Sequence, residues 1–314
     1  MSVVASAPAK AILFGEHFVV YGKPALAVAL RKRVYVRSRV VDGDMLEVIT
    51  PFGVSRHDRK NVSSDKSSVN MYILRTALLT MEHLGRYKGL RIEVNSEFPL
   101  GMGLGASAAS SVSTIASVAY ALGEPLQHDE ILRLSMEAER LVHKNPSGID
   151  SATCVYGGVV YFDGAARSLD TRVDINLLVI NSKIAKDTAT MVTRVRSLFE
   201  ENRAWFMEMA SISESITRQG KEALLDGDKI AMGIFMNKNH ELLKGIGVST
   251  DIIDALVDRA IMYGAYGAKL TGAGGGGCVI ALVDEYTGLL EVFKDNSPFV
   301  SGIEYEGLKI MNNL

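Results

Sequence analysis

The sequence predicts a two-domain protein in which each domain combines β-strands with α-helices. The chain has 314 residues, which is long enough for two hydrophobic cores. Apolar and polar residues alternate over 25–48, as in antiparallel strands, whereas several longer stretches carry apolar residues at helical spacing. A polar stretch over 163–173 precedes an apolar strand over 177–180. We therefore expect domains over 1–168 and 169–314.

The composition argues against several classes of protein. The net charge of −2 creates no field of one sign, so no nucleic-acid partner is predicted. No apolar run is long enough for a membrane span, and the N-terminus lacks the features of a secretion signal. Cys154 and Cys278 form neither a metal spacing nor a disulfide framework, so we expect two buried thiols in a cytoplasmic protein.

The first third should consist of strands and one helix. Residues 3–7 predict a short strand, and Asp42-Gly43-Asp44 predicts a hairpin turn. The polar segment 51–68 has no periodicity and predicts a surface loop. An apolar stripe predicts a helix over 69–84, and alternation predicts a strand over 90–94.

The segment Pro99–Ala109 connects that strand to a helix over 106–122 through a glycine-rich loop. The first turn of a helix has unpaired N–H groups and partial positive charge, and glycines let an oxyanion approach the backbone. This pattern predicts a phosphate site. A purely structural turn remains an alternative. The loop is not a Walker loop, and the dinucleotide fingerprint lacks its acid, because Glu124 lies in a predicted turn.

The middle of the chain predicts a helix from Pro125 to His143 that ends at Asn145-Pro146. A tight turn over 146–148 then leads to Asp150, and a strand follows over 155–162. An acid beside such a turn can be held towards a cleft, although a local Asx-turn would also explain it. The second half predicts helices over 187–202, 205–225, 229–245 and 251–264.

Two further segments contain candidate functional residues. Lys10, Glu16 and His17 lie in otherwise apolar sequence, where charges need partners or a polar cleft. A surface ion pair between Lys10 and Glu16, and a structural role for His17, are the simpler alternatives. Near the end, the glycine-rich run within Lys269–Leu282 lies between two strand-like pieces. It predicts a second backbone cradle over an anion or over the first glycine loop, rather than a linker.

Together these segments resemble the GHMP superfamily of small-molecule kinases. The resemblance covers Pro8–Ala25, Pro99–Ala109, Glu139–Asp150 and Lys269–Leu282. The runs Gly-Glu-His-Phe-Val-Val-Tyr-Gly and Asn-Pro-Ser-Gly-Ile-Asp are most similar to the mevalonate kinase family within it. One departure is Ala106, which stands where the family often has a serine. The resemblance implies an α+β fold with a ribosomal-S5-like N-terminal domain and a ferredoxin-like C-terminal domain, with the active site between them.

The resemblance also implies roles for individual residues. Asp150 would accept the proton of the primary alcohol of mevalonate, beside Lys10, which would stabilise the developing negative charge. Glu16 would orient Lys10 by ion pairing, and His17 and Thr271 would lie at the substrate. Ser107 and Glu139 would hold Mg²⁺. The residues that would hold the ATP phosphates are Gly101, Gly103, Leu104, Gly105, Ala106, Ser107 and Ala108.

The implied reaction is the ATP-dependent phosphorylation of the 5-hydroxyl of mevalonate, with ATP and mevalonate as partners. The nearest alternative is a related kinase acting on phosphomevalonate or a sugar, for which Arg194 and Arg196 could supply a basic cluster. A nucleotide-binding protein without catalysis would lack Lys10 or Asp150. A dinucleotide oxidoreductase would bind NAD instead of MgATP. The sequence leaves a homodimer open.

Overall fold

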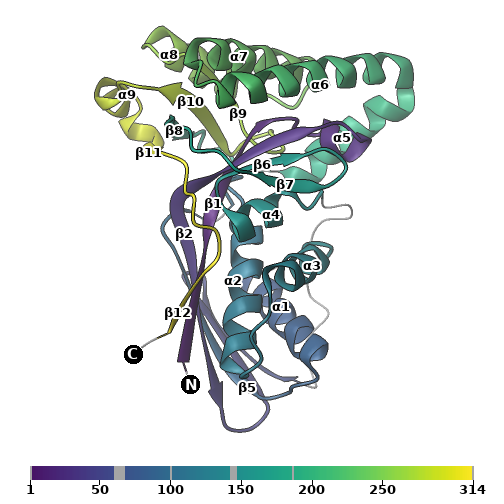
Figure 1. The fold of residues 1–314 in the computed structure, drawn as a ribbon, viewed down its shortest axis with the longest axis vertical. Coiled ribbons are helices and arrows are strands. Elements are labelled where there is room, and N and C mark those ends of the chain that lie inside the picture. The colour runs from purple at the N-terminus through teal and green to yellow at the C-terminus, as the bar shows by residue number, and fades with distance from the viewer. Residues whose placement is uncertain (1, 60–67, 100, 142–146, 186, 313–314) are drawn as a thin grey trace.

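The computed structural model describes residues 2–59, 68–99, 101–141, 147–185 and 187–312. An elongated sheet from the N-terminal half carries helices along one face, and a smaller sheet with its own helices lies at one end of it (Figure 1). The two-domain architecture predicted from the sequence is the one observed.

The larger sheet has eight strands in the described part of the chain. Its main path runs β12-β1-β2-β5-β3-β4, while β6 pairs with β2 and β7 with β6. The strands are β1 (Ser2–Phe14), β2 (Ala25–Val41), β3 (Met45–Thr50), β4 (Gly53–Asp58), β5 (Gly89–Ser96), β6 (Val159–Phe162), β7 (Ala166–Leu169) and β12 (Lys309–Asn312).

Two polar segments form strands that the sequence did not predict. The expected loop over 51–68 begins with β4, which pairs with β3 as a hairpin, while residues 60–67 lie outside the described part. Likewise β7 occupies part of the polar stretch 163–173 and pairs with β6. Both strands are at an edge of the sheet and are largely exposed, so they lack the apolar alternation by which a strand is recognised.

Four helices belong to the larger sheet: α1 (Val69–Leu84), α2 (Ala106–Ala121), α3 (His128–Glu139) and α4 (Ile149–Tyr156). The first two match their predicted bounds closely. The helix predicted to reach His143 ends at Glu139, and residues 142–146 lie outside the described part.

The start of the strand predicted over 155–162 is wrong. Residues 149–156 are helical, and the strand begins only at Val159. Ile149, Ala152 and Val155 lie three residues apart and are all buried, which gives α4 one apolar face. In so short an apolar run, periodicity does not distinguish a helix from a strand.

The smaller sheet has the order β11-β8-β10-β9, and all of its pairs are antiparallel. Its helices include α6, α7 and α8, which lie together at the top of Figure 1. The four predicted helices are confirmed. The elements are β8 (Asn176–Asn181), α5 (Thr188–Glu201), α6 (Arg203–Leu225), α7 (Lys229–Gly245), α8 (Asp251–Met262), β9 (Gly267–Leu270), β10 (Cys278–Val283), α9 (Thr287–Val292) and β11 (Phe299–Ser301), with short 3-10 turns η1 (Phe18–Tyr21) and η3 (Lys294–Asn296).

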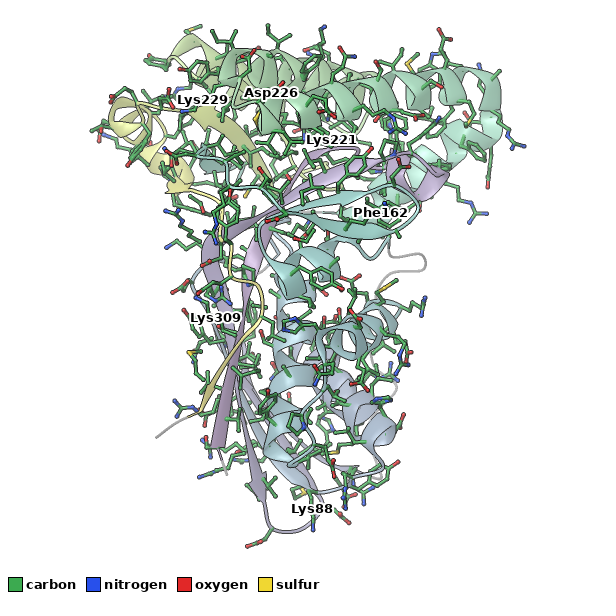
Figure 2. All side chains as sticks on the ribbon, in the orientation of Figure 1. Lys88, Phe162, Lys221, Asp226, Lys229 and Lys309 are labelled. Carbon is green, nitrogen blue, oxygen red and sulfur yellow. The ribbon has the colours of Figure 1, made fainter. Side chains whose placement is uncertain are left out.

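The C-terminal strand returns to the larger sheet. β12 pairs with β1, and Figure 2 labels Lys309 at the start of this strand. Ahead of it, Ile303 bridges to Leu30, and the buried Arg33 donates to the carbonyls of Glu306 and Gly307. The predicted division into 1–168 and 169–314 would place β12 in the second domain, whereas β12 is part of the sheet of the first.

Cys154 and Cys278 are both fully buried, as predicted, and neither forms a disulfide. In the described ranges, no helix has the length and apolar character needed to cross a bilayer.

Candidate active site

The glycine loop shapes the N-terminal end of α2. Gly101, Gly103 and Gly105 all have positive φ, a conformation that glycine adopts without strain. Gly105 is the N-cap residue of α2, and no side chain caps the first turn. The first turn, which begins with Ala106, Ser107 and the buried Ala108, therefore leaves backbone N–H groups without a side-chain cap, and a phosphate site needs such groups.

Strand β1 runs directly against this loop. The backbone N–H of Lys10 donates to the carbonyl of Leu104 over 2.9 Å. A Cβ on Gly105 would lie 2.6 Å from Cγ of Lys10, so only glycine leaves room for the lysine side chain. The loop and the lysine are thus fitted to each other.

The structure brings Lys10 and Asp150 together. Nζ of Lys10 lies 3.0 Å from Oδ2 of Asp150, and the lysine side chain is only 3% exposed against 36% for the aspartate. Asp150 is in the first turn of α4, after Gly148 in a left-handed conformation. A nearly buried ammonium therefore meets a carboxylate that solvent can reach, beside the N-terminus of α2.

Glu139, the last residue of α3, is a buried carboxyl near this pair. Burial raises its pKa from 4.5 to about 8, and the charge of Asp150 adds to this effect. A hydrogen bond with Ser151 and the charge of Lys10 oppose the shift without cancelling it. The protein alone therefore disfavours the ionised form of Glu139, and a cation bound beside the carboxyl would favour that form.

Tyr72 is a residue of this site that sequence reasoning missed. It is buried on α1, and its hydroxyl makes no hydrogen bond of good geometry in the described part of the chain, although the side chains of Ser107 and Ser111 lie near it. Burial, and then the charge of Glu139, raise its pKa to about 12, while hydrogen bonding towards Ser107 and Ser111 lowers it. In the sequence Tyr72 looks like one more member of the buried face of a helix, so no signal distinguishes it.

The predicted ion pair between Glu16 and Lys10 is wrong. Glu16 instead contacts Lys269, and both side chains are almost completely buried. The other carboxylate oxygen of Glu16 accepts a hydrogen bond from Asn239 over 3.2 Å. Lys10 is held by Asp150, so each lysine has its own acid. Only the packing of β9 against the N-terminal segment decides between these pairings.

His17 and Thr271 both connect the N-terminal segment to the last glycine-rich segment. Nε2 of His17 hydrogen-bonds to the carbonyl of Ala273 over 2.9 Å. The Thr271 hydroxyl accepts from the backbone N–H of Ile12 at 2.9 Å and donates to its carbonyl at 3.1 Å. Because this hydroxyl both accepts and donates a hydrogen bond to Ile12, Thr271 holds the two segments together.

The two glycine-rich segments face each other, one of the two arrangements predicted for the second cradle. A Cβ on Gly277 would lie 3.0 Å from the carbonyl oxygen of Met102, and one on Gly272 would lie 3.4 Å from that of Gly103. Lys10, Asp150, Glu139 and the glycine loop thus form one cluster, and the second glycine segment closes against it.

This fold and cluster match the GHMP kinases. The family model for the GHMP kinases N terminal domain matches residues 71–158, and that for the GHMP kinases C terminal region matches 221–291. The chain belongs to the GHMP kinase family, which implies the use of ATP. The family predicted from the sequence is therefore confirmed.

Within this family, relatives that are 32–36% identical to this chain are mevalonate kinases. The mevalonate kinase of Thermococcus sibiricus is 36% identical, over 99% of this chain and 98% of the relative. The crystal structure of the Methanococcus jannaschii mevalonate kinase has a TM-score of 0.83 and 29% identity, with 98% of each chain covered. A Lactococcus lactis galactokinase complexed with galactose has a TM-score of 0.84 at 16% identity, covering 98% and 95%, so the fold alone does not distinguish these substrates.

Proposed function

We propose that this chain transfers the γ-phosphoryl group of ATP to the 5-hydroxyl of mevalonate, giving 5-phosphomevalonate for isoprenoid synthesis. The contact between Lys10 and Asp150 beside the N-terminus of α2 is the observation that carries the proposal. Phosphoryl transfer needs an oriented hydroxyl, a proton acceptor and positive charge near the phosphates, and this cluster offers each of them.

Each residue of the cluster has a distinct role in the proposed reaction. The glycine loop binds the phosphates of ATP through backbone N–H groups. Asp150, which solvent reaches, accepts the proton of the hydroxyl as it attacks. Lys10 pairs with that carboxylate and stabilises negative charge in the transition state. His17 lies on the substrate side, whereas the Glu16 carboxylate is buried against Lys269, and Thr271 fixes the segment that carries both residues.

The residues at the loop also fit Mg²⁺. Ser107 supplies a hydroxyl and Glu139 a carboxylate, which are the hard oxygen ligands that Mg²⁺ prefers. The burial of the Glu139 carboxyl supports a cation there, since its ionised form needs a nearby positive charge. When bound, Mg²⁺ would neutralise charge on the β- and γ-phosphates. Without Mg²⁺, Lys10 still provides a buried positive charge in the site.

A phosphorylated substrate has less support. Arg196 pairs with Glu200 over 2.7 Å on an exposed turn of α5, and Arg194 packs against Gly247. Neither arginine therefore offers the unpaired positive charge that the phosphate group of phosphomevalonate would need. We place the reaction in the cytoplasm, with the two buried thiols as support, and a homodimer remains open.

An assay of ATP consumption with mevalonate, phosphomevalonate, galactose and homoserine tests this proposal. We expect kcat/KM for mevalonate to exceed the others by at least about 100-fold, since the wrong substrate leaves site groups unpaired. A mock preparation, purified in the same way from cells that do not make this chain, is the control for contaminating kinases. A preference for phosphomevalonate or galactose would replace the proposed substrate, and equal turnover in the mock preparation would point to a contaminant.

A further inference from the structure

Lys269 is a buried lysine that the proposed mechanism does not use. It lies on β9, and its side chain is 0% exposed. Its ammonium contacts the Glu16 carboxylate and donates to the carbonyl of Leu270 over 2.6 Å. The carbonyl of Ile12, at 3.5 Å, completes its surroundings. An ammonium this deep in the protein persists only with such partners.

The acid that it contacts lies in a constrained segment. Gly15 has a φ of +92°, and a Cβ there would lie 2.4 Å from the carbonyl oxygen of Pro24. His17 has a φ of +63°, which is uncommon for a residue other than glycine. Glu16 lies between these two, so the backbone directs its carboxylate towards β9.

A second lysine lies close to this pair. The Lys269 ammonium is 3.5 Å from the carbonyl of Ile12, which is two residues from Lys10 on β1. Burial lowers the pKa of Lys269, and the charge of Lys10 adds to this effect. A buried carboxylate in contact with Lys269 therefore also attracts Lys10. Without Lys269, Glu16 would compete with Asp150 for the Lys10 ammonium, because an unpaired buried charge is costly.

We propose that Lys269 is a positioning residue of the phosphoryl-transfer site: by pairing with Glu16 it leaves the Lys10 ammonium to Asp150. This inference rests on the proposed function, since it assigns Lys10 and Asp150 to the transfer step. Lys269 itself touches no reacting atom. The segment from Ile12 to His17 is then held at three points, by Lys269 on β9 and by Thr271 and Ala273 just after it, and Lys269 supplies the charged contact.

A double-mutant cycle tests the proposal. The variants are Lys269→Met, Glu16→Gln and the double variant, each assayed for kcat and for KM of both substrates. We expect Lys269→Met to lower kcat at least about tenfold with little change in KM for ATP, because Lys10 is drawn from Asp150. In the Glu16→Gln background the same substitution should lower kcat less than about threefold, since no competing carboxylate remains.

The outcomes separate positioning from stability. Lys23→Met is the matched control, because Lys23 pairs with Glu214 over 2.7 Å and also joins the N-terminal segment to the C-terminal half. It should leave kcat unchanged. A kcat for Lys269→Met equal to wild type, or an equal loss in both backgrounds, would overturn the proposal. If Lys269→Met does not fold, Lys269→Gln, which removes the charge but keeps a polar side chain, replaces it in the cycle with the same expected outcomes.

A failure of the proposed function can be distinguished from a failure of the inference about Lys269. Wild-type chain without turnover of mevalonate rejects that function, whatever the variants do. The coupling between Glu16 and Lys269 is then measured by urea unfolding of the same four chains. Additive effects on stability would show that the two side chains are not paired, and would reject the inference as well.

Discussion

The Lys10 ammonium and the Asp150 carboxylate are 3.0 Å apart, although one residue is on the first strand and the other on α4. The lysine is enclosed by the glycine loop and Leu104, while the aspartate remains accessible. A buried cation beside an accessible base is suited to a reaction in which the hydroxyl of a bound substrate attacks a phosphate.

Replacing Asp150 by Asn tests the proposed base. The amide keeps the size of the side chain but accepts no proton, so kcat should fall by about 10² to 10⁴ with little change in KM for ATP. Steady-state kinetics check this. Retained turnover would remove Asp150 from the proton transfer and leave it an orienting role.

The two proposed Mg²⁺ ligands can be tested together. Ser107→Ala and Glu139→Gln each remove an oxygen ligand, so the Mg²⁺ concentration for half-maximal rate should rise about tenfold or more. Glu137→Gln is the matched control, because Glu137 is on the same helix but pairs with Arg133 at the surface. Identical Mg²⁺ titrations of the variants and wild type would contradict the assignment.

The pKa of Glu139 predicts how stability depends on pH without metal. Folded Glu139 has a pKa of about 8 and the reference value is 4.5, so the folded state binds this proton more tightly. Its contribution to stability is complete below about 4.5 and is lost as the pH rises through about 8. In EDTA, the urea unfolding free energy should fall over this interval. Glu139→Gln should flatten the profile, and equal slopes would refute the prediction.

Gly105→Ala should disturb Lys10 directly. The new Cβ would lie 2.6 Å from Cγ of Lys10 in a backbone with φ +75°, so we expect a stability loss of about 1–3 kcal/mol and a large fall in kcat. Gly123→Ala introduces similar strain at φ +80° with nothing within 4 Å. It should cost stability but not kcat. Equal kcat losses in both variants would argue against a specific clash.

Tyr72→Phe tests the unpartnered hydroxyl near Ser107. If this hydroxyl contacts the bound phosphates or a hydrated metal, its removal should raise KM for MgATP severalfold. Stability should be unchanged or slightly higher, because the free protein loses a buried donor without a partner. Tyr87→Phe, at an exposed position, is the control. An unchanged KM would show that the Tyr72 hydroxyl does not reach the ligand.

Much of the site could be predicted because its features are local. Positive φ at Gly101, Gly103 and Gly105 is encoded by the glycines themselves, and the helix that follows is encoded by its alanine-rich apolar face. Edge strands such as β4 and the short helix α4 were harder to predict, because exposed edges and short apolar runs carry weak periodicity.

The sequence alone determined the family, the glycine loop, and the presence of Lys10 and Asp150 in one site. The tertiary structure decided which acid pairs with which lysine, placed the Tyr72 hydroxyl beside Ser107, and returned β12 to the first sheet. The physical reason is that backbone conformation and apolar stripes depend on neighbouring residues. The partner of a buried charge depends on which distant segments pack together, and no local pattern records that choice.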